Sequence, residues 1–116
     1  MPSGTHTTRS PLKLPVLHIL MALSEDSLHG LGIADRVEDA SEGVIQLGPG
    51  TLYRSLDEMQ EADLIEKAEP PEENVDPRRK YYRITPRGRN LLQAEMERFE
   101  RLVEHARARN VLPGRA

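Results

Sequence analysis

The sequence predicts a small α+β domain that is mainly helical, with three helices, a β-hairpin and one long terminal helix. Two observations lead to this prediction. Apolar residues recur at helical spacing in separate segments, and two short segments before the last of them have the composition of paired strands. The chain has 116 residues, of which 37% are hydrophobic. One domain with a thin core is therefore expected, and a second copy would enlarge that core.

Composition excludes several classes of protein. The chain has no Cys, which excludes a disulfide-stapled secreted domain and a thiolate metal site. The longest apolar run, residues 16–23, is interrupted by His18 and is too short to span a bilayer. Residues 1–10 are polar and lack the apolar core of an export signal. We therefore expect a soluble cytoplasmic protein with no membrane partner.

The first two predicted helices lie in the first third of the chain. The first helix is predicted to begin near Pro15 and to end near Ser24. Its own apolar residues lie on nearly all of its sides, which indicates that the helix is buried. Ser27 is predicted to cap a second helix over residues 28–40.

Three residues at the start of the second helix need their own explanation. Gly30 and Gly32 are poor helix formers that cost about 1 kcal/mol each relative to Ala, so we expect them to allow close approach of another backbone. His29 is either a ligand or base, or a structural residue at a helix start. The structural interpretation is favoured, because no second His or carboxylate stands at metal-ligand spacing from it.

A third helix and a hairpin follow. The helix is predicted over residues 49–62, with Leu52, Leu56 and Met59 in one narrow apolar stripe. The strands are predicted at about residues 64–68 and 80–84. Between them, residues 69–77 hold three prolines and four acids and are expected to form an acidic tip without a core.

Charge changes sharply along the chain, although the net charge is only −3. Residues 55–76 contain nine acids and one base, whereas residues 77–94 contain six bases and no acid. One interpretation is an electrostatic footprint for a polyanion such as nucleic acid. The other is a solvated hairpin whose bases pair with the nearby acids. Charge alone does not decide between them.

The last predicted helix, residues 86–109, begins after the cap Thr85 and has the seam of a coiled coil. Five apolar residues recur at spacings of 4, 3, 4 and 3, namely Leu92, Met96, Phe99, Val103 and Ala106. The alternative is a helix that folds back on its own domain. Leu91 and Leu102 widen the apolar stripe enough for both the domain and a partner, so dimerisation is favoured.

This order of helices and hairpin is that of a winged helix-turn-helix, which we assign to residues 14–85. Residues 1–13 are predicted to form a flexible arm and residues 110–116 a flexible tail. In this architecture the third helix enters the major groove of DNA, and the hairpin lies along the backbone.

The DNA contacts are predicted on the first turns of the third helix and on the second strand. Arg54 can donate two hydrogen bonds to a guanine edge. Tyr53 either contacts DNA or completes the core beside Leu52. The full set of predicted contacts is Thr51, Tyr53, Arg54 and Ser55 on the helix, and Arg78, Arg79, Lys80, Tyr81 and Arg83 on the hairpin.

Four motifs resemble, in order, those of the PadR-like transcriptional regulators. They are His29-Gly30-Leu31-Gly32-Ile33, Leu47-Gly48-Pro49-Gly50-Thr51-Leu52-Tyr53, Asp63-Leu64-Ile65 and Arg79-Lys80-Tyr81-Tyr82-Arg83-Ile84-Thr85-Pro86-Arg87-Gly88. The resemblance covers residues 14–109. It implies a dimeric winged helix-turn-helix repressor that binds an inverted-repeat operator. Some members bind flat aromatic ligands at the dimer centre, but the terminal helix here has only Phe99 as an aromatic, so the sequence identifies no inducer.

Two other functions are alternatives to DNA binding by a repressor. An enzyme is not expected, because the four His are scattered over separate segments and Gly48-Pro49-Gly50-Thr51 lacks the Lys of a phosphate-binding loop. We accordingly expect no catalytic residue, metal site or cofactor. The alternative to DNA binding is a winged helix used only for protein contacts, because fold does not determine function.

Overall fold

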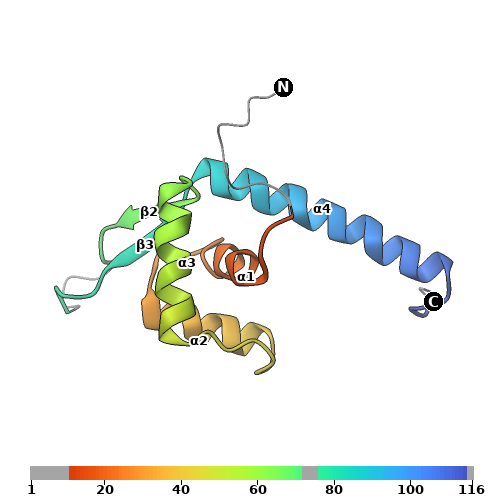
Figure 1. The fold of residues 1–116 in the computed structure, drawn as a ribbon, viewed down its shortest axis with the longest axis horizontal. Helices are drawn as coiled ribbons and strands as arrows, with labels where there is room; N and C mark the ends of the chain where they lie inside the picture. The colour runs from red at the N-terminus through yellow and green to blue at the C-terminus, as the bar shows by residue number, and fades with distance from the viewer. Residues whose placement is uncertain (1–10, 72–75, 115–116) are drawn as a thin grey trace.

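The computed structural model describes residues 11–71 and 76–114. Most of the predicted N-terminal arm, the centre of the acidic tip and the end of the tail lie outside the described residues. Figure 1 shows a body of three helices and a small sheet from which a long helix extends. The elements in chain order are α1 (Leu14–Ala22), β1 (Leu28–His29), α2 (Gly30–Ala40), α3 (Pro49–Glu61), β2 (Ile65–Ala68), β3 (Tyr81–Ile84) and α4 (Pro86–Ala108). The predicted α+β class and element order are confirmed.

The second helix begins two residues later than predicted. Leu28 and His29 form β1, and the Nδ1 atom of His29 caps α2 by accepting a hydrogen bond from the backbone N–H of Gly32 at 3.2 Å. The prediction that Ser27 caps this helix is wrong, because pairing with β3 holds the two residues after it in an extended conformation. The structural interpretation of His29 is confirmed.

The predicted hairpin belongs to a three-stranded antiparallel sheet of order β1-β3-β2. Ile65 of β2 lies opposite Ile84 of β3, and His29 of β1 lies opposite Tyr81. The β1 strand could not be predicted from the sequence, because a strand of two residues has no readable periodicity. This short strand fixes the start of α2 beside the base of the hairpin.

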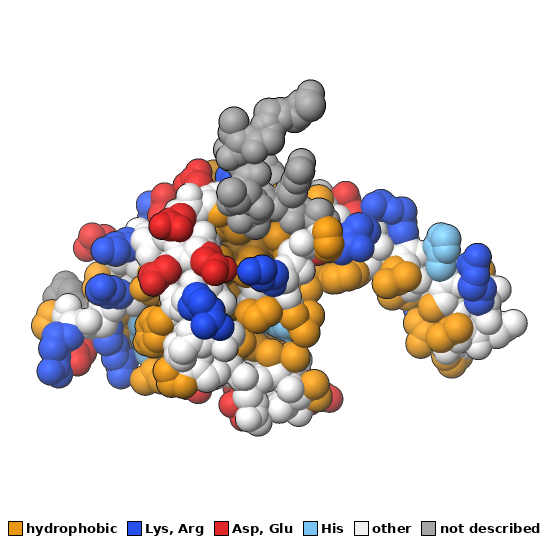
Figure 2. All heavy atoms as spheres, viewed as in Figure 1, with side chains coloured by type: hydrophobic (Ala, Val, Ile, Leu, Met, Phe, Trp, Pro, Cys, Tyr) orange, Lys and Arg blue, Asp and Glu red, His pale blue; other side chains and the backbone are white. Residues whose placement is uncertain are grey.

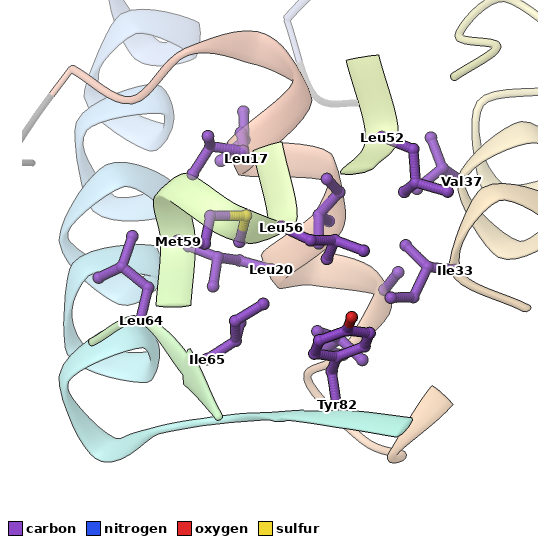
Figure 3. Close-up of a cluster of buried hydrophobic side chains, with 14 of the residues drawn as sticks. Leu17, Leu20, Ile33, Val37, Leu52, Leu56, Met59, Leu64, Ile65 and Tyr82 are labelled. Atoms are coloured by element: carbon purple, nitrogen blue, oxygen red, sulfur yellow. The ribbon is translucent and has the colours of Figure 1, made fainter. Parts of the chain in front are cut away.

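The core is built by side chains from α1, α2, α3 and the sheet (Figure 3). The predicted stripe on α3 is confirmed, since Leu52, Leu56 and Met59 are all buried. Tyr82 points from β3 into the same cluster, where Leu20 of α1 is fully buried. The face of α3 opposite this stripe is therefore the face left to solvent.

The α4 helix packs on the body with its first half and leaves it with its second (Figure 1). Leu92 is buried in the core, and Met96 and Phe99 pack against it. These three residues were predicted in a dimer seam. The predicted dimer contact of Leu92 is corrected, because this half of α4 packs on α1 of its own domain. Met96 and Phe99 are half-buried, so their place in the seam stays a prediction. Val103, further along the helix, is exposed.

One buried carboxylate on α4 was missed by the sequence analysis. Glu95 is completely buried, pairs with Arg98 at 3.0 Å and accepts the backbone N–H of Leu12 at 2.7 Å. Leu12, which the sequence assigned to the arm, also packs against the core. The chain just before α1 is thus attached to α4.

The start of α4 is joined closely to the turn after α3. The Oγ1 atom of Thr85 donates to the carbonyl of Asp63 at 2.6 Å and accepts the backbone N–H of Gly88 at 3.0 Å, which confirms Thr85 as the cap. Gly88 lies directly against the carbonyl oxygen of Leu64, where a Cβ atom would overlap that oxygen. Only glycine fits this position without movement of the backbone.

Candidate nucleic-acid interface

The solvent face of α3 carries three of the four residues predicted to contact DNA. Tyr53 and Arg54 are exposed, and Thr51 is half-buried. Ser55 is buried on the core side of the helix. Its predicted DNA contact is therefore corrected, because one helical step of about 100° turns it away from the face that carries Arg54.

Tyr53 reaches from α3 to the first residue of α2. A Cβ atom at Gly30 would lie 3.0 Å from the Cζ atom of the Tyr53 ring. The close approach expected at this glycine is confirmed, but its partner is a side chain and not another backbone. The ring remains 48% exposed, so Tyr53 packs on α2 and also faces solvent.

The base of the hairpin presents its basic side chains to solvent. Arg78 pairs with Asp76 at 3.1 Å, and Arg83 pairs with Glu66 at 2.7 Å, in contacts with much of both side chains exposed. Hydrogen bonds from Arg78 hold the pKa of the Asp76 carboxyl below its ordinary value. Exposed pairs of this kind contribute little to stability, because solvent screens them. They therefore leave the arginines available to an incoming phosphate.

Of the other hairpin residues predicted to contact DNA, two are exposed and one is buried. Arg79 and Lys80 are exposed. Tyr81 is buried, and its ring meets the His29 ring edge to face, with 5.4 Å between centroids. The predicted DNA contact of Tyr81 is corrected for this reason.

Acidic and basic side chains occupy different parts of the visible surface. Figure 2 shows acidic side chains over the C-terminal end of α3 and basic ones over the hairpin. The acids there include Glu58, which is 3.9 Å from Lys13, and Glu61. The N-terminal turns of α3 thus face a basic neighbourhood, and its acidic end lies away from it.

A hollow of about 460 Å³ lies between the start of α2, α3 and the hairpin. Side chains from all three elements line it, namely His29, Leu31, Tyr53, Asp57, Arg78, Arg79, Lys80 and Tyr82, together with Gly30. The hairpin contributes three cations and α3 one carboxylate. Asp76 partly neutralises one of these cations.

His29 lies between α2 and the hairpin. Its Nε2 atom is 3.2 Å from Nη1 of Arg79, a contact between residues 50 positions apart in sequence. Burial, and then the charge of Arg79, lower the pKa of the His29 imidazole from its ordinary value of 6.5, against a smaller effect of Asp35 that raises it. The neutral ring is therefore the favoured form in the folded protein.

We expect acidification to weaken the fold through His29. Below about pH 6.5 the unfolded chain binds a proton at His29 more readily than the folded chain does, because folding lowers the pKa of this imidazole. The free energy of unfolding therefore falls as the pH drops below this value. Urea midpoints at about pH 7.5 and about pH 5.5 measure the change. The His29→Asn variant keeps a capping side chain and should show a smaller pH dependence. An equal pH dependence in both proteins would contradict the assignment.

Two absences apply to the described part of the chain. No group of three or more His, Cys, Asp or Glu in residues 11–71 and 76–114 is arranged to hold a metal ion. Across the same residues, every helix is too short or too polar to cross a membrane.

The sequence is similar to a family of regulators and to two longer proteins. The sequence profile of the transcriptional regulator PadR-like family matches residues 19–94. The chain is 34% identical over 95 residues to the transcriptional regulator YqjI of Escherichia coli K12, covering 82% of this chain and 44% of that protein. It is 36% identical over 84 residues to an uncharacterised 37.1 kDa protein in a transposon of Streptomyces fradiae, covering 72% and 22% respectively. This chain spans less than half the length of these relatives.

Solved structures share the fold. A PadR family regulator of Clostridium difficile R20291 is 23% identical, with a TM-score of 0.69 over 86% of this chain and 100% of that one. The PadR-like regulator BC4206 of Bacillus cereus is 24% identical, with a TM-score of 0.68 over 86% and 92%. Bacillus subtilis PadR, solved in complex with operator DNA, is 17% identical, with a TM-score of 0.63 over 72% and 47%. Since the family profile covers residues 19–94, from within α1 to the first half of α4, the chain belongs to the PadR-like family of transcriptional regulators.

Proposed function

We propose that this chain is a sequence-specific DNA-binding repressor that acts as a homodimer on an inverted-repeat operator. One observation carries the proposal: Tyr53 and Arg54 are exposed on the first turns of α3 beside the basic base of the hairpin. Acidic side chains gather over the other, C-terminal end of α3 on the same visible face (Figure 2). The complex of Bacillus subtilis PadR with operator DNA, a protein of similar fold, supports this proposal.

The proposed contacts follow from exposure and chemistry. Arg54 reads a base edge in the major groove, where a guanidinium matches guanine O6 and N7. Thr51 and Tyr53 contact phosphate or base beside it. Arg79 and Lys80 bind phosphates, a term that does not depend on sequence and weakens with salt. Arg78 and Arg83 extend this contact by exchanging their exposed carboxylate partners for phosphate.

The homodimer is proposed through the second half of α4. Four apolar residues are exposed there and just after it, namely Leu102, Val103, Val111 and Leu112. We call these residues the terminal patch. Ala106 of the predicted seam lies between Val103 and Val111 in the sequence and is half-buried. A symmetric dimer would present two α3 helices to successive major grooves, about 34 Å apart.

We expect the Arg79→Ala, Lys80→Ala double variant to bind every duplex more weakly. Loss of two phosphate contacts should flatten the slope of log Kd against log salt by about 1.8. Affinity should fall on the order of 100-fold or more, since hydrogen bonds to charged groups contribute about 1.5–3 kcal/mol each. Fluorescence anisotropy with a duplex of arbitrary sequence, titrated at several salt concentrations, measures both quantities.

A charge-matched control comes from the same chain. Arg101→Ala with Arg109→Ala removes two exposed cations, one from α4 and one from the residue that follows it, away from the hairpin, and should leave the slope unchanged. Sedimentation checks that both variants keep the oligomeric state of the parent. If the parent shows no salt-dependent binding to duplex DNA, the winged helix serves protein contacts and the proposal fails.

A further inference from the structure

The pair formed by His29 and Arg79 contains a conflict between hydrogen-bond donors. A neutral imidazole has one N–H and one acceptor nitrogen. Because Nδ1 accepts from the N–H of Gly32, the proton of the ring is on Nε2. The Nε2 atom lies 3.2 Å from Nη1 of Arg79. A guanidinium nitrogen only donates hydrogen bonds. Two donors therefore face each other.

The alternative tautomer moves the conflict without removing it. With the proton on Nδ1, Nε2 accepts from Arg79, but Nδ1–H then faces the N–H of Gly32. In the part of the chain that the structure describes, no carboxylate or carbonyl oxygen accepts from Nε2 of His29 or Nη1 of Arg79. An acceptor supplied from outside would satisfy both donors at once.

The spacing suits a single oxygen atom. An oxygen at the usual N–H···O distance of about 2.9 Å from each nitrogen forms a nearly equilateral triangle with the 3.2 Å separation of the two nitrogens. The ring is held in place by the Gly32 hydrogen bond, by pairing of His29 with Tyr81 and by the edge-to-face contact with the Tyr81 ring.

The surroundings select a negatively charged oxygen. The pair borders the hollow between α2, α3 and the hairpin, which is also lined by Lys80, Arg78 and the Tyr53 side chain. Asp57 is the one carboxylate among the residues that line it, and it lies on α3. A carboxylate ligand would also be attracted here, but a phosphate offers additional oxygens to Lys80 and Arg78 in the same hollow.

We propose that His29 and Arg79 form a clamp that binds one phosphate oxygen, so that His29, beyond its structural role, is a phosphate-binding residue. The inference rests on the proposed function, because the hollow lies between α3 and the hairpin, the two elements proposed to contact DNA. A backbone phosphate bound there joins the start of α2 to both of them. A free phosphate has the same chemistry and is the other source of the ligand.

Two substitutions separate the two nitrogens of the ring. His29→Asn places an amide oxygen near the position of Nδ1, which keeps the cap of α2 but removes the Nε2 donor. His29→Gln places an amide N–H near the position of Nε2 and loses the cap. We expect His29→Asn to keep the urea midpoint at neutral pH and to bind every duplex roughly three- to tenfold more weakly. We expect His29→Gln to be less stable but to bind more tightly than His29→Asn once folded.

Salt dependence and coupling distinguish this clamp from a general loss of charge. His29 is neutral, so His29→Asn should leave the salt slope unchanged, whereas Arg79→Ala lowers it by about 0.9. In the Arg79→Ala background, His29→Asn should have a smaller effect, because both side chains hold the same oxygen. Full additivity, or unaltered binding by His29→Asn alongside normal salt-dependent binding by the parent, would refute the clamp and leave the proposed function intact. Absence of DNA binding by the parent refutes both.

The source of the phosphate is tested on the unmodified chain. NMR signals of the His29 ring nitrogens are followed during addition of inorganic phosphate and, separately, of duplex DNA. A shift with DNA alone identifies a backbone phosphate as the ligand. A shift with inorganic phosphate that also displaces DNA identifies a free anion that competes for the same site. Unchanged ring signals with both ligands overturn the proposal.

Discussion

Leu102→Glu together with Val103→Glu is expected to convert the protein into a folded monomer with at least about 100-fold lower affinity for its operator. Both side chains are exposed, by 62% and 37%, on the half of α4 that has left the body. Glutamate is a good helix former, so α4 should persist. In a dimer, however, the four new carboxylates would lie in the proposed apolar contact, where they lose water without gaining partners.

The size of the effect follows from the two half-sites of the operator. When one subunit is bound, the other is held at an effective concentration that raises the overall affinity by a factor of about 100 to 10,000. A monomer loses this factor but keeps its affinity for a single half-site. The measurements are sedimentation equilibrium for the oligomeric state, and anisotropy with a full operator selected from random DNA and with its isolated half.

A matched variant controls for the added charge. Gln93→Glu with Ala94→Glu adds the same two charges at exposed positions on the first half of α4 and should remain a dimer. A Leu102, Val103 variant that still sediments as a dimer would exclude the terminal patch as the interface. A monomer with undiminished affinity for the full operator would exclude the two-half-site arrangement.

The order of the helices was predictable because α1, α3 and α4 each have a local start signal, whereas the cap predicted for α2 was wrong. Pro15, Pro49 and Pro86 mark helix starts, Thr85 has the chemistry of a cap, and the stripe through Leu56 has a helical period. These signals act within a few residues. They could be read without knowing which segments meet in space.

Features that depend on distant residues were not predictable in the same way. The strand β1 exists because residues 28–29 pair with β3, more than 50 positions later. Glu95 lies on the same helical face as Leu92, and composition gave no reason to expect a buried carboxylate that binds the backbone of Leu12. The seam on α4 had the right period, but a period does not say whether the domain or a partner covers it.

The residues of the candidate site also separate into those with a local sequence signal and those whose position depends on distant parts of the chain. The exposure of Tyr53 and Arg54 at the start of α3 agrees with their predicted place on the solvent face, and their contact with DNA stays a prediction. The burial of Ser55 was readable from the sequence, because Ser55 lies three positions after Leu52 and four before Met59, on the face of their stripe. The burial of Tyr81 depends on the pairing of β3 with β1, which the sequence does not state. The contact between His29 and Arg79 required the sheet that brings α2 to the hairpin.

Gly88→Ala is the substitution with the largest expected effect on stability, because Gly88 lies directly against the backbone of Leu64. The new Cβ atom would overlap the carbonyl oxygen of Leu64. This oxygen belongs to the backbone and accepts the N–H of Thr85 at 3.0 Å, so it cannot move away without breaking the junction between α3, the sheet and α4. We expect the free energy of unfolding to fall by roughly 3 kcal/mol, which is at the upper end of the cost of overpacking. The Tm should decrease on the order of 10 °C.

Gly50→Ala is the matched control for this substitution. Gly50 lies in the first turn of α3, and a Cβ atom there would meet nothing within 4 Å. Alanine is the better helix former by about 1 kcal/mol, so this variant should be as stable as the parent or more so. Urea denaturation followed by circular dichroism measures both variants. Equal midpoints for Gly88→Ala and the parent would mean that the junction yields. The N-terminal end of α4 would then not be held rigidly to the body, and the proposed dimer could not hold its two α3 helices at a fixed separation.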